Sequence, residues 1–129
     1  MSEKRSGIIR IPSHELPTQP EGWVEISAYV KRKHLPYIAA LQTVDENILA
    51  NANTSAQEKA REMRKFDEFH ASFVYGWNWT DGEGVAYPEP HGNADAFGEL
   101  RQEEWAWLQG KINEVMAQNR IPKSSDTPS

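Results

Sequence analysis

Histidines and carboxylates are the residues of this chain that could bind a metal ion or transfer protons. The chain has 129 residues and no cysteine, so disulfides and cysteine-based metal sites are excluded. Its four histidines are scattered and lack the short spacing of a metal-ligand set; they are His14, His34, His70 and His91. The sequence therefore predicts no metal site.

The segment TDGEG, residues 80–84, superficially resembles a calcium-binding loop. Its acids are Asp81 and Glu83 alone, whereas an EF-hand loop supplies oxygen ligands from about five or six positions. Asp-Gly is common turn chemistry, because both residues tolerate the backbone conformations that tight turns need. We therefore interpret this segment as a turn.

Paired acids occur at Asp67-Glu68 and at Glu103-Glu104. Adjacent residues on a helix diverge by about 100°, so neither pair would converge on one substrate. The chain also lacks a nucleophile-elbow pattern, a phosphate-binding glycine loop and a serine–histidine pattern. The sequence predicts no catalytic residue and no cofactor, and we expect the protein not to be an enzyme.

Aromatic side chains are the remaining concentration of potential binding groups, and the candidates for partner binding are Trp77, Trp79, Tyr87, Trp105 and Trp107. In an extended segment, Trp77 and Trp79 would point to the same side. Trp77 and Trp105 continue apolar stripes, which favours packing at a helix end. Trp79 and Trp107 fit those stripes less well. We expect them on the surface, where tryptophan contributes disproportionately to binding.

Composition restricts the partners that the chain can have. Hydrophobic residues make up 38% of the sequence, enough for one modest domain, and the formal net charge is −5. Binding to nucleic acid needs a clustered cationic surface, so we expect no nucleic-acid partner. The one basic run, KRKH at 31–34, is interpreted as a solvated face. An uninterrupted apolar run of membrane-spanning length is also lacking, so we expect no membrane partner.

Two strand-like segments lie near the N-terminus. GIIRI (7–11) is a short β-like run, and WVEISAYV (23–30) alternates between apolar and polar positions, as expected of a half-buried strand. A two-stranded element this small needs helices to pack against.

Three amphipathic helices are predicted after these strands. The first runs from Pro36 to Ile48, and the second follows a capping box formed by Ser55 and Glu58. The apolar stripe of the second helix continues to Trp77. A third helix is predicted over 99–118. The fold class expected is mainly α, a small helical domain of about three helices with a short N-terminal β-hairpin or strand. The expected domains are an extended leader at 1–21, a single helical domain at 22–118 and a disordered tail at 119–129.

The order of several short motifs resembles one known family. GWVEI (22–26) is followed by GWNWTDGEG (76–84), then by YPEP (87–90) and LRQEEWAWLQGKI (100–112). This order resembles the tail assembly chaperones of long-tailed, siphovirus-type bacteriophages and their prophage relatives. The resemblance covers roughly residues 22–112, although the prolines of the loop come later than in the family pattern.

The resemblance implies a non-enzymatic role. Such chaperones bind the tape measure protein and assist polymerisation of the tail tube protein around it, in the host cell cytoplasm, and they are absent from the mature virion. Many are also made as a second, longer frameshifted product. Self-association is compatible with this role. Two alternatives stay open: a structural tail or neck protein of the virion, and a module that binds a sugar or base on Trp77 and Trp79.

Overall fold

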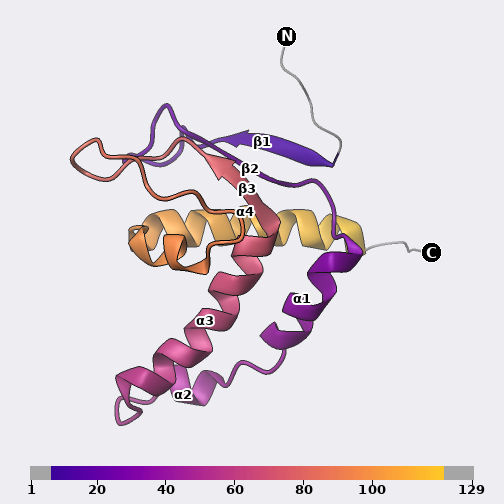
Figure 1. Ribbon diagram of the computed structural model, residues 1–129, viewed down its shortest axis with the longest axis vertical. Coiled ribbons are helices and arrows are strands. Elements are labelled where there is room, and N and C mark those ends of the chain that lie inside the picture. The colour runs from indigo at the N-terminus through magenta and orange to yellow at the C-terminus, as the bar shows by residue number, and fades with distance from the viewer. Residues whose placement is uncertain (1–6, 121–129) are drawn as a thin grey trace.

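The computed structural model describes residues 7–120. Residues 1–6 of the expected leader, and the expected disordered tail beyond Arg120, lie outside the described residues. The described chain folds into an antiparallel sheet, a long helix beside it, and a group of helices that extends away from both (Figure 1).

The sheet has three strands in the order β1-β2-β3, formed by Ile8–Pro12, Trp23–Ser27 and Val74–Trp77. Alternation in β2 places Val24 and Ile26 in the core at 0% exposure. Ile26 pairs with Ile9 of β1 in the register. The two strands predicted near the N-terminus are therefore confirmed, with β2 ending earlier than the expected segment.

Helical elements fill most of the remaining sequence. They are the 3-10 turns η1 (Arg32–His34) and η2 (Ala94–Glu99), and the helices α1 (Leu35–Leu41), α2 (Glu46–Ala50), α3 (Ala56–Phe73) and α4 (Gln102–Arg120). The capping box predicted at the start of α3 is confirmed: the Glu58 amide donates to the Ser55 hydroxyl at 3.1 Å, and Glu58 accepts from the Ser55 amide at 3.3 Å.

The expected fold class is wrong. Residues 7–120 form a mixed α/β structure, 50% helical and 14% strand, with a three-stranded antiparallel sheet packed against helices. The difference comes mainly from residues 74–77, which the apolar stripe assigned to the second helix. Val74 has φ −99° and ψ 127°, so the chain leaves the helix at Phe73 and pairs with β2. The apolar spacing of Phe73 and Trp77 is common to a helix and to a buried strand, and β-branched and aromatic residues favour the strand.

The first expected helix is also interrupted. The chain forms α1, turns at residues 42–45 and starts again as α2, in place of one helix from Pro36 to Ile48. The Thr43 hydroxyl donates to the Ala40 carbonyl at 2.6 Å, and the Asp45 carboxylate accepts from the Asn47 amide at 3.0 Å as the N-cap of α2. Thr and Asp compete with helical hydrogen bonding in this way, which explains the break.

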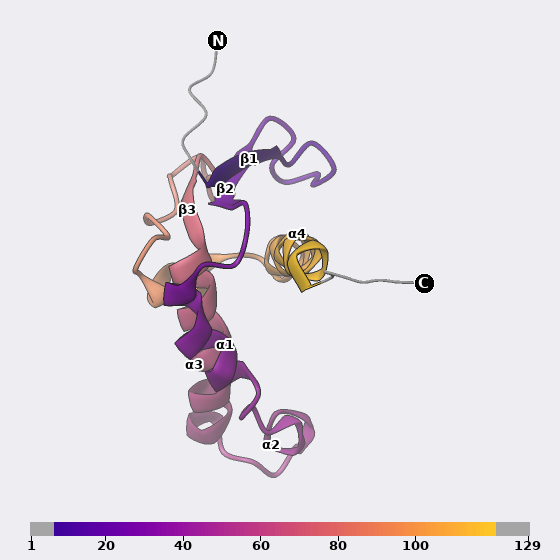
Figure 2. The ribbon, with the colours of Figure 1, turned by 90° about the vertical axis from the view of Figure 1, so that its right-hand side faces the viewer.

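Burial divides the described chain into two parts. One core cluster joins β2, β3, the end of α3 and α4, where Leu108 and Ile112 are fully buried. Residues 35–68, which we call the helical lobe, comprise α1, α2 and most of α3, and only Glu62 is buried among them. Figure 2 shows α4 end-on beside the upper part of the molecule, with the helical lobe extending below it.

Candidate functional site

Trp77 and Trp79 lie inside the protein. Their rings stack on each other with centroids 5.6 Å apart and planes 8° apart, so the prediction that they point to one side is confirmed. Trp77 is 6% exposed and Trp79 is 0% exposed. The expectation that Trp79 lies on the surface is therefore wrong, and the pair offers no exposed platform for a sugar or base.

Both indoles are fixed by hydrogen bonds. Trp77 Nε1 donates to the Pro88 carbonyl at 3.0 Å, and Trp79 Nε1 donates to Ser13 Oγ at 2.9 Å. Gly22 lies against Trp79: a Cβ added at this glycine would be 2.7 Å from Trp79 Cδ1. The interpretation of Trp77 as a core residue between the end of α3 and the returning loop is confirmed.

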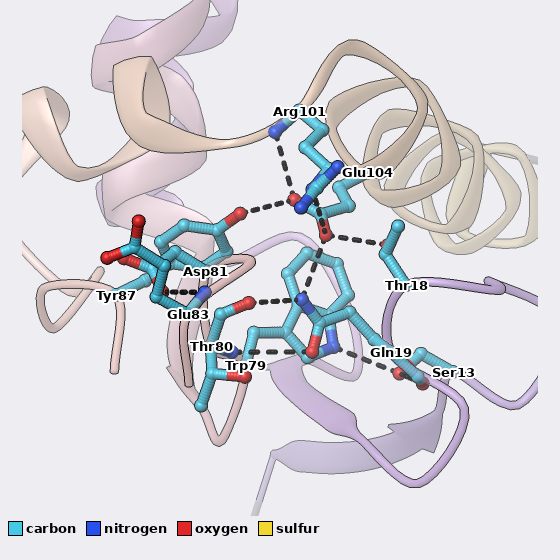
Figure 3. Close-up of polar contacts among 10 residues, drawn as sticks. All are labelled: Ser13, Thr18, Gln19, Trp79, Thr80, Asp81, Glu83, Tyr87, Arg101 and Glu104. Carbon is cyan, nitrogen blue, oxygen red and sulfur yellow. Dashed lines mark hydrogen bonds and ion pairs between the residues drawn. The ribbon is translucent and has the colours of Figure 1, made fainter. Parts of the chain in front are cut away.

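Glu104 is the centre of a buried polar cluster, which we call the Glu104 hub (Figure 3). Its side chain is 0% exposed. One carboxylate oxygen accepts from the Tyr87 hydroxyl at 2.8 Å and from the Arg101 amide at 2.9 Å. The other accepts from the Thr18 hydroxyl at 2.7 Å and from Gln19 Nε2 at 2.8 Å. The hub thus joins three segments that are distant in the sequence.

Gln19 extends this hub to the segment after β3. Its amide nitrogen also donates to the Thr80 carbonyl at 2.7 Å, and its amide oxygen accepts from the Thr80 amide at 3.3 Å. Gln19 therefore pairs with the backbone in both directions, as a neighbouring strand would. The connection between β1 and β2, which contains Gln19, is fastened to the rest of the fold by these contacts.

The ionisation of the hub follows from these contacts. Burial alone would raise the pKa of Glu104, but the hydrogen bonds from Gln19, the Arg101 amide, Thr18 and Tyr87 outweigh it and lower the pKa. Burial, together with the adjacent carboxylate, raises the pKa of Tyr87 to about 12. At neutral pH the hub therefore contains a charged carboxylate and a protonated phenol. Because both carboxylate oxygens already accept two hydrogen bonds, this arrangement is suited to holding segments together.

The remaining predicted aromatic residues are also placed by the fold. Tyr87 is 7% exposed, and its hydroxyl serves the hub. Trp105 is half-buried, with its ring 5.4 Å from that of His70. Trp107 is half-buried as well, and its indole nitrogen donates to the Glu15 carboxylate at 2.6 Å. Of the five candidates, only Trp105 and Trp107 retain substantial exposed surface, and their role in partner binding stays a prediction.

Residues 80–86 form the turn predicted from Asp-Gly. The Asp81 carboxylate accepts from the amides of Glu83 at 2.8 Å and Val85 at 3.0 Å, and these bonds lower its pKa. Gly84 has φ +82°, which favours glycine. In the part of the chain that the structure describes, no three histidine, aspartate or glutamate residues are grouped so that they could hold a metal ion.

Three of the five large apolar side chains that are exposed among the described residues lie in the helical lobe. Leu35 is 52% exposed, Tyr37 39% and Met63 36%. Other apolar residues of the lobe are half-buried; they are Ile38, Leu41, Val44, Ile48, Leu49 and Phe66. A surface hollow of about 390 Å³ lies at its upper end, lined by Tyr37, Arg64, Glu68, Ala71, Ser72, Gly92 and Ala94. The lobe therefore has apolar surface available for another molecule, in addition to the exposed Tyr29 and Val85 outside it.

Comparison with known proteins gives no relative: no protein-family model, no curated protein and no solved structure matches this chain. Among residues 7–120, no helix is both long enough and apolar enough to cross a lipid bilayer.

Sequence reasoning missed the features that distinguish the two parts of the molecule. The sequence identifies Glu104 only as one of two adjacent acids that diverge on a helix, and it does not single out Gln19. The spacing of Arg101 and Glu104 could have predicted one of the four hydrogen bonds of Glu104, because a glutamate at the third helical position commonly accepts from the N-cap amide. Its long-range partners had no sequence signal.

Proposed function

We propose that this chain is a non-enzymatic phage tail assembly chaperone, which binds the tape measure protein and assists polymerisation of the tail tube protein. The order of the motifs over residues 22–112 supports the family. We place the main contact with the tape measure protein on the helical lobe, because the aromatic cluster around Trp79 is used inside the fold.

The observation that carries this proposal is the burial pattern of the lobe. Of residues 35–68 only Glu62 is buried, although the segment carries aliphatic and aromatic side chains at helical spacing. Glu62 accepts from the Asp45 amide at 3.1 Å and from Lys65 Nζ at 2.9 Å, so it joins α2 to α3 by polar contacts. Apolar stripes that stay half-exposed in one chain are a suitable surface for an amphipathic helix of another.

A tape measure protein that has not yet been assembled exposes long apolar helical stripes of its own. Covering them with the helical lobe would remove both surfaces from water and prevent aggregation. The net charge of −5 would help to keep the complex soluble. Under this proposal, the well-packed part stabilises the fold and the helical lobe binds the partner, which explains why the lobe is incompletely packed.

Co-expression with the tape measure protein of the same genome tests the proposal. We expect the wild-type chain to keep that protein soluble and to co-purify with it. The double substitution Leu35→Glu and Met63→Glu should reduce recovery at least about tenfold, since each charge would be desolvated at the contact. Val85→Glu is the control for each of the two substitutions made singly, because Val85 is 60% exposed and lies in the turn at 80–86, outside the lobe.

Failure of the wild-type chain to rescue or bind the tape measure protein would contradict the proposed function. Equal loss in the Val85→Glu control would contradict the placement on the lobe. Mass spectrometry of purified particles separates the chaperone from a structural tail or neck protein. A chaperone should be missing from particles, whereas a structural protein should be present in stoichiometric amounts.

A further inference from the structure

A second surface, outside the helical lobe, collects positive charge around aromatic rings. It consists of Tyr29, Lys31, Lys33, Tyr75 and His91, which we call the lysine–tyrosine patch. Lys31 Nζ lies 5.6 Å and Lys33 Nζ 5.3 Å from the centroid of the Tyr75 ring. Lys31 Nζ is also 5.7 Å from the Tyr29 ring, and His91 stacks on Tyr75 at 4.4 Å.

The segment that carries the two lysines is held in place by His34. We interpreted KRKH as a solvated face, but His34 is 0% exposed. The centroid of its ring lies 4.7 Å from that of the Phe73 ring. Its Nδ1 accepts from the Lys31 amide at 2.9 Å, which closes the turn that presents Lys31 and Lys33. The lysines therefore project from an anchored turn.

The charge of the patch is not balanced within the described residues. Arg10, Arg64, Lys65, Arg101 and Lys111 each form an ion pair with a carboxylate there, whereas Lys31 and Lys33 form none. The Tyr75 hydroxyl is buried and has no hydrogen-bond partner among the residues that the structure describes. Two ammonium groups within about 6 Å of one ring, without a carboxylate partner among the described residues, favour the binding of an anion at this surface.

We infer that the lysine–tyrosine patch binds an acidic polypeptide segment that presents carboxylates next to an aromatic residue. Carboxylates would form charge-assisted hydrogen bonds with the two ammonium groups, while the exposed rings of Tyr29 and His91 would contact the aromatic residue. The cationic groups are few and the protein is acidic overall, with a net charge of −5. That balance favours a short acidic peptide over a nucleic acid, which needs an extended cationic track.

NMR titration of the full chain tests this inference with defined probes. The probe is the capped peptide Ac-Glu-Glu-Phe-Glu-Glu-NH2, compared with Ac-Gln-Gln-Phe-Gln-Gln-NH2 and with an oligouridylate, all at low salt. We expect saturable shifts of the amides of residues 29–33, 75 and 91 with the glutamate peptide. Binding of the glutamine peptide should be at least about tenfold weaker, and raising the salt should weaken the glutamate peptide several-fold.

Charge-reversal variants provide the matched control. Lys31→Glu with Lys33→Glu should abolish the shifts, and the milder Lys31→Gln with Lys33→Gln should weaken them. Lys59→Glu with Arg61→Glu makes the same change in net charge on α3 and should leave binding unchanged. An absence of saturable shifts, equal binding of the glutamine peptide, tighter binding of the oligouridylate, or equal loss in the α3 control would each overturn the inference. The measurement does not involve the tape measure protein, so its outcome is separate from that of the proposed function.

Discussion

Residues 35–68 and residues 69–79 follow each other along the chain but are buried to very different extents. In the first segment only Glu62 is buried, whereas in the second all residues except Ser72, Tyr75 and Asn78 are buried. The boundary falls within α3 itself, between its exposed and its buried turns. One continuous helix therefore connects a closed core to a surface whose apolar side chains are only half covered.

This difference in burial separates the residues that stabilise the fold from those that can bind another chain. The rest of the described chain, which we call the closed part, contains the paired polar groups of the Glu104 hub and large rings that fill the space between segments. The helical lobe has half-exposed apolar residues and few buried groups, so it contributes less to the free energy of unfolding. Its surface can change with little loss of stability, which suits a surface that binds another chain.

Removal of the Glu104 carboxylate should have the largest effect on the closed part. Glu104→Ala would leave the Tyr87 hydroxyl, Thr18 hydroxyl and Gln19 amide without their shared acceptor inside the protein. We expect a loss of about 3–5 kcal/mol in the free energy of unfolding, measured by urea denaturation at pH 7.

Glu103→Ala removes the neighbouring carboxylate, which is exposed, and should change the free energy of unfolding by no more than about 0.5 kcal/mol. Similar values for the two variants would show that the hub does not stabilise the fold.

Acidification should destabilise the closed part through His70, by somewhat less than the Glu104→Ala substitution does. Burial lowers the pKa of His70 to about 4, whereas the ordinary value is 6.5. Its Nδ1 lies 2.6 Å from the Phe66 carbonyl and donates to it, and the folded state favours the neutral ring. The contribution of His70 to the free energy of unfolding is fully present above pH 6.5 and is lost as the pH falls from 6.5 toward 4. The loss reaches about 3 kcal/mol at pH 4, since one pKa unit is about 1.4 kcal/mol.

The pH dependence of urea denaturation in wild type and in His70→Phe measures this loss. The carboxylate of Glu104 has a lowered pKa, so its contribution is present above its unfolded value of 4.5 and is lost only as the pH falls further, through its folded value. Burial raises the pKa of Asp67, and this contribution has the opposite sign, so the difference between wild type and His70→Phe is what isolates His70 between pH 6.5 and 5. His70→Phe should have the shallower slope there. Identical slopes would mean that His70 is not held neutral.

Local patterns in the sequence were sufficient to predict several elements. The alternation over 23–30 identified β2, the Ser55–Glu58 pair identified the start of α3, and the amphipathic pattern over 99–118 identified α4. Each of these signals depends on neighbouring residues alone. The Asp81 turn was predicted for the same reason.

Features that depend on distant residues were not predicted. Val74–Trp77 continued a helical stripe, and only its pairing with β2 decides that it is a strand. Trp79 was expected on the surface because it did not fit the stripe, but the connection before β2 covers it through Ser13 and Gly22. Burial of an aromatic ring by a segment more than fifty residues away has no periodic signal in one sequence.

Charged substitutions in the helical lobe should have the smallest effect on stability. Leu35→Glu and Met63→Glu each place a carboxylate where the native side chain is already partly in water, and glutamate is a good helix former. We expect each to change the free energy of unfolding by no more than about 0.5 kcal/mol in urea denaturation. The same variants should weaken co-purification with the tape measure protein, so binding and stability would separate at these positions. A loss of more than about 1 kcal/mol in the free energy of unfolding would mean that these side chains of the lobe help to stabilise the fold. A loss of co-purification in these variants would then reflect unfolding.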